Sequence, residues 1–279
     1  MPDPLPTEIQ EQAQGAKPTE SQLQTPAKPE EHHDKTTLSE YLESLLVTVI
    51  LALFGTTFVV QAFKIPSASM EGTLLIGDHV LVNKFIFGGT GAWYEKLLPY
   101  RPLERGDIIV FKYPYGEHPH YVKRVIGLPG DHLKLADGDV FINGKRLSEP
   151  YAVHDPSAFT DPFNLSFPPV RGQMISPNVI DEWRPQIRKY VQGDELVVPA
   201  GKYFAMGDNR DRSQDSRDWG FVDHDAIMGR PFLIYWSVEA KSSDYSGDST
   251  FWSRLAGVFD TLAHLPTRTR WSRMLHTVH

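Results

Sequence analysis

The chain has 279 residues, of which 41% are hydrophobic, so it has room for one large domain or two modest ones with packed cores. Its formal net charge is −7, and residues 1–43 alone hold nine acidic and three basic side chains, so the remainder is nearly neutral and lacks the basic field that nucleic-acid binding needs. The absence of cysteine excludes disulfides and thiolate zinc sites.

The amino-terminal segment, residues 1–38, is acidic and rich in Pro, Glu, Gln and Thr, with almost no aromatic residues. A segment of this composition cannot bury enough apolar area to offset the entropy of ordering, so we predict a disordered cytoplasmic tail. Thr37 or Ser39, followed by Glu40 and Glu43, indicates the start of a helix.

Residues 44–63 form a run of twenty uncharged residues. At about 1.5 Å per residue, such a helix spans a hydrocarbon layer of roughly 30 Å. We therefore predict a transmembrane anchor helix over residues 39–63. The alternative is a cleaved signal peptide, with a small-x-small cleavage site at residues 60–62, but the long acidic segment before the run favours a retained anchor.

After this run, short β-type stretches alternate with Gly, Pro and Asp, which predicts a mainly β fold over residues 64–240. The Asn143-Gly144 pair predicts a hairpin turn, and residues 128–131 (LPGD) predict a chain reversal. The expected strands are residues 79–87, 107–113, 121–128, 132–142, 195–198, 202–206 and 231–237.

Two segments depart from this rhythm. Residues 151–193 are rich in proline, and we interpret them as a surface insertion between two β segments. Residues 241–279 carry apolar residues at helical spacing together with several arginines. This C-terminal segment is predicted to be either an interfacial helix on anionic lipid headgroups or an ordinary terminal helix docked on the domain.

A candidate nucleophile lies just after the apolar run, in the segment PSASM at residues 66–70. Ala68 and Gly72 leave room beside Ser69 for a substrate backbone, and Ser67 offers a second hydroxyl two residues earlier. Most serines in turns only cap helices or satisfy backbone groups, so the setting alone does not establish a reaction.

Lys123 is a candidate base because it lies inside an apolar, strand-like run. With a reference pKa of about 10.4, fewer than roughly one lysine in a thousand is neutral at pH 7. Lowering the pKa by about two to three units requires about 3 to 4 kcal/mol, which burial among apolar neighbours can supply. The alternative is a lysine on an edge strand that is ion-paired or extends its amine to solvent.

Residues 207–217 crowd charges and hydroxyls into eleven positions. They do not match a calcium loop, because the sixth position counted from Asp211 is Ser216 rather than glycine and the twelfth is Val222 rather than glutamate. The simplest interpretation of this segment is a solvated loop with local ion pairs.

Four segments in order, after a membrane anchor, are similar to the successive motifs of bacterial type I signal peptidases, the leader peptidases of family S26. The resemblance covers about residues 61–147 and 194–236 and leaves out the acidic tail and the insertion. The matching segments are PSASMEGTL at 66–74, RGDIIVF at 105–111, YVKRVIGLPGD at 121–131, and residues 207–220, which begin GDNR.

The resemblance implies a fold of the kind shared by signal peptidases and LexA-like proteins, with Ser69 as nucleophile and Lys123 as general base. Ser67 and the backbone N–H of Ser69 would form the oxyanion hole, and Ser213 would orient the lysine amine. The remaining implied roles are supporting ion pairs for Arg124 with Asp208 and Asp215 with Arg217, and small-residue pockets lined by Phe63, Ile65 and Val122.

The implied function is a membrane-anchored serine endopeptidase that removes signal peptides from exported preproteins after small residues, without metal or cofactor. The implied location is the bacterial cytoplasmic membrane, crossed once, with the catalytic domain on the outer, periplasmic face. Two features depart from the pattern: Gly72 stands where many members have proline, and a single span precedes the serine where some relatives have two.

Other classes remain as alternatives. A conjugation-type processing peptidase would share the serine/lysine pair, whereas a self-cleaving repressor should carry a DNA-binding region and no span. A membrane-tethered β-domain could bind partners without catalysis. A zinc hydrolase on His118 and His120 is disfavoured because the two histidines flank Pro119 in an expected loop without a carboxylate-bearing helix motif.

Overall fold

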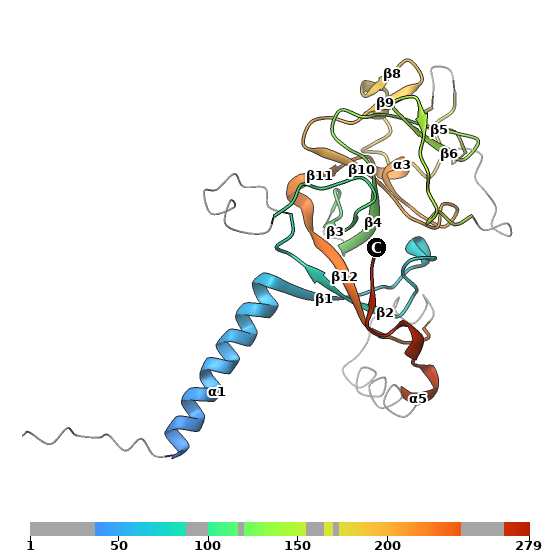
Figure 1. Cartoon of the computed structure of the whole chain (residues 1–279). Helices are drawn as coiled ribbons and strands as arrows, with labels where there is room; N and C mark the ends of the chain where they lie inside the picture. Colours follow the sequence, from blue (N-terminus) through green and yellow to red (C-terminus); the bar gives the residue numbers. More distant parts are fainter. Residues whose placement is uncertain (1–36, 88–99, 117–119, 155–164, 170–172, 241–264) are drawn as a thin grey trace, which may run out of the picture. The chain divides into compact units, whose positions relative to one another are not determined.

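The computed structural model describes residues 37–87, 100–116, 120–154, 165–169, 173–240 and 265–279, and it is mainly β, with two antiparallel sheets after one long helix (Figure 1). The chain divides into two compact units, residues 1–47 and 48–279, and every strand that the structure describes belongs to the second unit. The prediction of a β-rich domain preceded by an apolar helix is confirmed. Residues 1–36 of the predicted acidic tail lie outside the described residues, whereas Thr37 and Leu38 already belong to the long helix.

The larger sheet has eight strands in the order β1-β2-β12-β3-β4-β10-β11, and β13 pairs with β12. β12 is long and joins two partners, since its first residues pair with β3 and its later ones with β2. The strands are β1 (Val60–Lys64), β2 (Asp78–Asn83), β3 (Ile108–Lys112), β4 (His120–Gly127), β10 (Lys202–Met206), β11 (Val222–Asp223), β12 (Ile227–Ser237) and β13 (His276–Thr277).

The smaller sheet has five strands in the order β7-β6-β5-β9-β8. Its strands are β5 (His132–Ala136), β6 (Asp139–Ile142), β7 (Lys145–Arg146), β8 (Val191–Gln192) and β9 (Glu195–Val197). Short helical turns punctuate both sheets: η2 (Ala68–Met70), η4 (Ile187–Lys189), α3 (Ser216–Trp219), η5 (His224–Ala226), α5 (Leu265–Arg268) and η7 (Trp271–Arg273).

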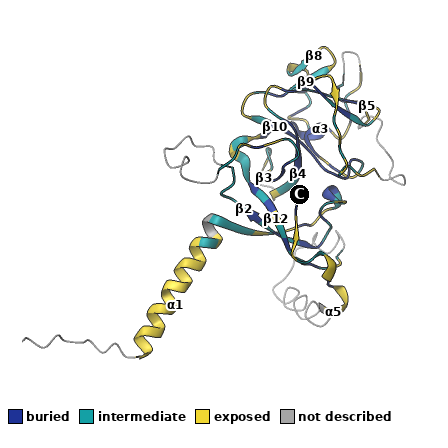
Figure 2. Cartoon of the chain, viewed as in Figure 1, coloured by how far each residue is buried: buried dark blue, intermediate teal, exposed yellow. Residues whose placement is uncertain are grey.

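Buried residues, dark blue in Figure 2, occur along β2, β10, β12 and α3. One apolar cluster joins the smaller sheet to the 151–193 segment, a second lies among β1, β2, β3 and β12, and a third lies among β3, β4 and β10. Each fully buried aliphatic or aromatic side chain contributes about 1.5 to 3 kcal/mol to the free energy of folding. β3 belongs to two clusters because alternate residues of a strand face opposite sides.

The anchor helix predicted over residues 39–63 is too long at its C-terminal end. Helix α1 (Thr37–Phe54) continues into a π-helical turn, η1 (Gly55–Val59), and the chain then enters strand β1. All five residues of β1 pair with β2. The residues that could have been a signal-peptide cleavage site, 60–62, therefore lie inside a sheet.

Helix α1 ends where residues of low helix propensity begin. Gly55 is followed by β-branched residues, and Thr56 returns its hydroxyl to the backbone oxygens of Ala52 and Leu53. Glycine and threonine both disfavour helix interiors relative to leucine or alanine. Absence of charge identified an apolar run but did not distinguish its helical part from its strand.

The 151–193 segment is not confined to the surface as expected. Phe167, Val179, Trp183 and Ile187 are all buried and pack into the cluster of the smaller sheet. Backbone bonds between Phe167 and Leu135 tie the segment to β5 at 2.7 and 3.2 Å. The described part of this segment therefore supplies core to the domain.

Several local predictions are confirmed. Asn143-Gly144 forms the turn between β6 and β7, and the amide of Asp131 bonds to the carbonyl of Leu128 at 3.0 Å in the reversal after β4. The stretch expected as one strand over 132–142 is a hairpin, because Asp137 and Gly138 both adopt positive φ and turn the chain. Asp-Gly is a strong hairpin signal that the strand prediction overlooked.

The C-terminal segment is only partly described, since residues 241–264 lie outside the described ranges. Its last residues do not continue as a helix. After α5 and η7 the chain forms β13, which pairs with β12 through Leu233–Thr277 and Ile234–His276. This end of the chain is docked on the larger sheet.

Candidate active site

Ser69 lies in the single helical turn η2, between strands β1 and β2. The turn is held by Met70 and Leu74 on its buried side, which are 1% and 0% exposed. The amides of Thr73 and Leu74 both bond to the carbonyl of Met70, at 3.1 and 2.8 Å. Two apolar anchors and a short hydrogen-bonded turn thus fix the backbone that carries the hydroxyl.

Lys123 lies in the middle of β4 and is 2% exposed. Its Nζ is 2.6 Å from the Oγ of Ser69, so a hydrogen bond joins two residues 54 positions apart. The pairing of Ile109 with Lys123 between β3 and β4 sets the register that delivers the amine to this point. The structure thus brings the two predicted reacting groups into direct contact.

The surroundings of Lys123 favour its neutral form. Burial lowers the pKa of the amine to about 8, and the cation of Arg217 adds to this effect. Asp215 acts in the opposite direction, as Asp208 and Asp218 also do, because each anion favours the ammonium. At a pKa of about 8, roughly one amine in ten is neutral at pH 7, which is enough for a general base.

Ser67 is exposed at the start of η2, with its Oγ 3.4 Å from that of Ser69. This position beside the nucleophile fits an oxyanion donor. Ser213 is buried, but its Oγ has no hydrogen-bond partner among the described residues. The bond from Ser213 to the lysine amine that the resemblance implies is therefore not formed in this structure.

Gly207 allows the backbone of residue 207 to lie close to both Ser69 and Ser213. A Cβ at this position would lie 2.3 Å from the Oγ of Ser213 and 2.4 Å from the carbonyl oxygen of Ser69. Distances this short are not tolerated, so any side chain at position 207 would displace the backbone of the serine. The amide of Asn209 bonds to the same carbonyl of Ser69 at 3.1 Å.

Arg124 and Asp208 form a buried bidentate ion pair, with Nε–Oδ1 and Nη2–Oδ2 both at 2.8 Å. Thr73 donates its hydroxyl to Asp208 at 2.6 Å, and Arg124 also bonds to the carbonyl of Gly106 at 2.7 Å. The network links β4 to the turn of Ser69 on one side and to the 207–217 segment on the other. A planar guanidinium suits this role because it makes several bonds in fixed directions.

Asp215 and Arg217 form the second predicted pair, with Nε–Oδ1 at 2.8 Å and Nη2–Oδ2 at 2.9 Å. Burial alone would raise the pKa of Asp215, but the Arg217 guanidinium outweighs it and the pKa is lowered. Asp215 also caps α3, and Asp218 returns a bond to the amide of Asp215 in a reciprocal capping box. The pair is therefore built into the start of this short helix.

Phe63, Ile65 and Val122 are brought together in the apolar cluster that also contains Met70. Ile65 is buried, whereas Phe63 and Val122 are partly exposed beside it. Residues predicted from separate segments therefore share one apolar surface next to the Ser69 turn.

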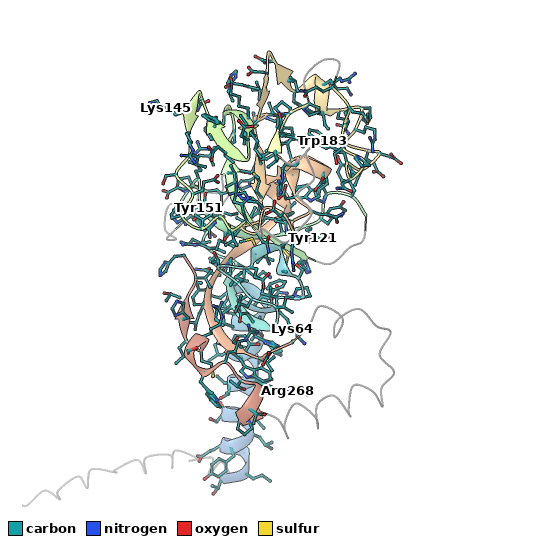
Figure 3. The ribbon with its side chains drawn as sticks, turned by 90° about the vertical axis from the view of Figure 1, so that its right-hand side faces the viewer. Lys64, Tyr121, Lys145, Tyr151, Trp183 and Arg268 are labelled. Atoms are coloured by element: carbon teal, nitrogen blue, oxygen red, sulfur yellow. The ribbon has the colours of Figure 1, made fainter. Side chains whose placement is uncertain are left out.

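Sequence reasoning missed the residues that cover Arg124. The ring of Tyr151 lies 4.0 Å from the guanidinium of Arg124, and the ring of Tyr121 lies 5.7 Å from the amine of Lys123 (both tyrosines are labelled in Figure 3). Arg210 binds both carboxylate oxygens of Glu149, at 2.6 and 3.1 Å. Nothing in the Pro-rich sequence around Tyr151 predicted the contact between Tyr151 and Arg124, although arginines often stack on aromatic rings.

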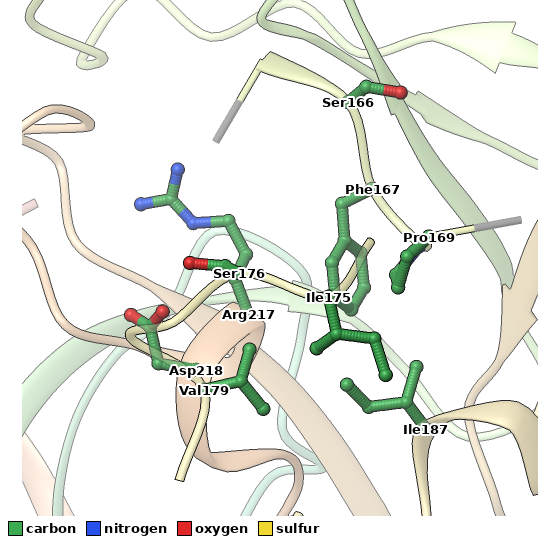
Figure 4. A pocket seen from close by; sticks show the side chains of 9 residues that line it. All are labelled: Ser166, Phe167, Pro169, Ile175, Ser176, Val179, Ile187, Arg217 and Asp218. Carbon is green, nitrogen blue, oxygen red and sulfur yellow. The ribbon is translucent and has the colours of Figure 1, made fainter. Parts of the chain in front are cut away.

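A separate pocket lies where the 151–193 segment meets α3 (Figure 4). Ser176, Arg217 and Asp218 line one side, and Phe167, Ile175 and Ile187 line the other.

No group of three His, Cys, Asp or Glu side chains that could hold a metal occurs within the part of the chain that the structure describes, and His118 falls outside that part.

Comparison with known proteins places this geometry in a family. The model of the family described as signal peptidase, peptidase S26, matches residues 38–236. Similar proteins include signal peptidase I of Pseudomonas fluorescens, 35% identical over 72% of this chain and 73% of the relative, and that of Pseudomonas aeruginosa, 34% identical over 76% and 77%.

A relative from another genus supports this match. Signal peptidase I of Aquifex aeolicus is 32% identical over 74% of this chain and 87% of the relative. A crystal structure of a signal peptidase I from Enterococcus faecalis aligns at 32% identity with a TM-score of 0.33, covering 47% of this chain and 97% of that one. From the match to the family model and the identities to the Pseudomonas and Aquifex relatives, the chain belongs to the signal peptidase family, peptidase S26, and is a hydrolase of the signal peptidase class.

Proposed function

We propose that this protein is a membrane-anchored serine endopeptidase that removes signal peptides from exported preproteins, with Ser69 as nucleophile and Lys123 as general base. The observation that carries the proposal is the 2.6 Å contact between a buried lysine amine and a serine hydroxyl. The lowered pKa of Lys123 supports the role, because only a neutral amine can take the hydroxyl proton.

The reaction is acyl transfer at a peptide bond. Lys123 accepts the proton of Ser69, and the oxygen attacks the carbonyl carbon that precedes the mature sequence. Ser67 and the backbone N–H of Ser69 stabilise the oxyanion, and the lysine ammonium protonates the leaving amine. Neutral Lys123 then activates the water that hydrolyses the ester.

The sheet offers two places for an extended substrate to bind. β1 lies at one end of the larger sheet and has only β2 as a partner among the described residues. In β4, residues 120–124 pair with β3, whereas on the other side β10 pairs with residues 124, 125 and 127 and not with residues 120–123. A signal peptide that adds a strand at these edges would pass Phe63 and Val122, whose partly exposed side chains would select small residues before the cut.

Membrane attachment is proposed through α1. This helix is long and apolar enough to cross a bilayer, and none of its residues is buried. At 18 residues and about 1.5 Å per residue it spans about 27 Å, close to the hydrocarbon thickness. We propose a single crossing of the bacterial cytoplasmic membrane, with the β unit on the outer face where exported preproteins emerge.

Cleavage of a preprotein with an Ala-x-Ala site by the detergent-purified protein tests the proposal. Ser69→Ala and Lys123→Ala should each remove measurable turnover while retaining the parent circular dichroism spectrum. Ser67→Ala should lose roughly a hundredfold in kcat, because one oxyanion donor is worth about 2.7 to 4 kcal/mol. A folded Lys123→Ala variant with parent turnover, or a parent reaction stopped by a chelator, would exclude the dyad.

A further inference from the structure

The last described residues of the chain, Thr269–His279, lie beyond residues 38–236 that match the family. This C-terminal arm runs beside β12, and it is red in Figure 1. Its side chains reach back almost 200 positions to residues 73–78, the loop that directly follows the turn of Ser69.

Arg273 holds both ends of that loop. Its Nη2 donates to the carbonyl of Thr73 at 3.0 Å and to the Oδ2 of Asp78 at 2.6 Å. Asp78 is 0% exposed, and its only cationic partner among the described residues is Arg273. The other donors to its carboxylate are the hydroxyl of Ser237 at 2.6 Å and the amide of Leu75 at 2.8 Å.

Arg270 holds the middle of the loop. Its guanidinium donates to the carbonyls of Ile76 and Val238, and it lies against Gly77. Gly77 has a φ of +89°, and a Cβ there would lie 2.0 Å from the carbonyl oxygen of Val238, so the close approach requires glycine.

The loop held in this way bonds to three residues around the proposed dyad, namely Asp208, Met70 and Ile65. Thr73 bonds to Asp208 at 2.6 Å and, through its amide, to the carbonyl of Met70. The backbone of Ile65 bonds to Asp78 and Gly77, each at 2.9 Å. A shift of this loop would therefore move the turn of Ser69 and one wall of the proposed substrate pocket together.

The end of the arm completes the same region. Val278 is buried in the cluster that contains Ile65 and Met70, with Val122 packed against it. The carbonyl of His279 lies 3.3 Å from the Nη2 of Arg124. The arm thus contacts both the loop after the nucleophile and the arginine next to the proposed base.

We propose that the C-terminal arm is a positioning element for the nucleophile, with Arg273 as its central residue, a role that rests on the proposed function of Ser69. Arg273 does not touch the reacting atoms. It fixes Thr73 and Asp78, and through them it sets where the hydroxyl of Ser69 stands relative to Lys123. A displacement of about 1 Å can cost about a hundredfold in rate, so the geometric demand on this loop is strict.

Arg273→Met tests the proposal because methionine fills a similar volume and cannot donate. The variant should show a kcat about 10- to 100-fold below the parent for the same preprotein, with KM changed far less. Arg273→Lys, which keeps a cation, should recover part of the loss. Arg188→Met removes an exposed arginine from η4 and serves as the matched control with parent kinetics.

A second pair of variants separates positioning from stability, because Arg273→Met leaves the carboxylate of Asp78 buried without a cation. Asp78→Asn alone removes the buried anion that Arg273 neutralises, and its kcat is the reference for the double variant. The double variant, Asp78→Asn with Arg273→Met, should have a melting temperature above that of Arg273→Met and close to that of the parent. The kcat of the double variant should nevertheless remain about tenfold or more below that of Asp78→Asn.

An equal kcat in Asp78→Asn and the double variant would overturn the proposal, as would a parent kcat in folded Arg273→Met. Ser69→Ala is measured alongside. If Ser69→Ala retained turnover, the proposed nucleophile would fail, whereas parent turnover in Arg273→Met beside an inactive Ser69→Ala would exclude only the arm.

Discussion

Lys123 shows how one residue can be unfavourable for folding and useful for reaction. Its amine is buried and close to the buried cation of Arg217, and both features disfavour the ammonium. Three carboxylates in the same region act in the other direction and keep the pKa at about 8. The balance leaves the amine basic enough to take a proton and neutral often enough to do so near physiological pH.

This balance predicts the pH dependence of cleavage. In the proposed mechanism only neutral Lys123 accepts the proton of Ser69, so kcat/KM should rise about tenfold per pH unit below pH 8 and level off above it. An unperturbed lysine would extend the rise to about pH 10.4. The measurement is kcat/KM between pH 6 and 10, with circular dichroism at each pH as the folding control, and a rise that continues past pH 10 would contradict the shifted pKa.

At the residue scale the sequence anticipated contacts between motifs better than contacts outside them. Ser69 and Lys123 could be paired because each lies in a short segment with a recognisable pattern, and the structure places them 2.6 Å apart. Tyr151 could not be anticipated over Arg124, because it lies in a Pro-rich segment without periodicity. The orientation of the Ser213 hydroxyl could not be predicted either, since a side-chain rotamer depends on packing rather than on sequence spacing.

At the scale of elements, α3 connects helix capping to electrostatics. It has four residues, too few to be stable alone, and the reciprocal bonds between Asp215 and Asp218 hold its first turn. The same Asp215 pairs with Arg217 and, through its charge, favours the ammonium of Lys123. The capping residue of a short helix therefore contributes to the pKa of the proposed base on another strand.

Asp215→Asn should move the acidic limb of kcat/KM to lower pH. Asparagine still caps a helix, but it no longer stabilises the ammonium, so the pKa of Lys123 should fall below about 8. Leaving Arg217 buried without its anion should also cost about 3 to 5 kcal/mol of stability. Asp223→Asn, at an exposed ion pair with Lys202, is the matched control. A limb that stays in place or moves to higher pH would refute the role of Asp215.

The strands that could be predicted from the sequence differ physically from those that could not. β4 was predicted within one residue of its observed bounds, because a short apolar run next to proline and glycine is a local signal. β2 alternates buried and half-buried residues, and its start was predicted within one residue, although the predicted strand ran to residue 87 and the observed one ends at Asn83. β1 was missed because its residues continue an uncharged run, and pairing with β2 rather than composition decides its state. β13 was missed because two residues form a strand only through a partner already in place.

At the scale of the whole molecule, the proposed site is assembled from segments that are far apart in the chain. Ser69 follows β1, Lys123 is on β4, and the arm that holds the Ser69 loop lies after residue 268. All of these belong to the unit of residues 48–279, whereas most of α1 belongs to the unit of residues 1–47. The chemistry and the proposed membrane attachment are thus carried by different parts of the chain.

This division predicts that a variant lacking residues 1–54 folds and cleaves a soluble peptide with a kcat near that of the parent. It keeps β1, whose five pairs with β2 complete the sheet next to Ile65. The same variant should leave the membrane fraction, whereas the full-length protein should resist extraction by alkaline carbonate.

The control is a second truncation lacking residues 1–64, which also removes β1. It should lose peptide cleavage, because the edge strand proposed to receive the substrate is gone and Phe63 is lost with it. Sedimentation of membranes and peptide kinetics on both truncations provide the measurements. Cleavage by the shorter variant at the parent rate would show that β1 takes no part in the site, and extraction of the full-length protein by carbonate would refute α1 as a membrane anchor.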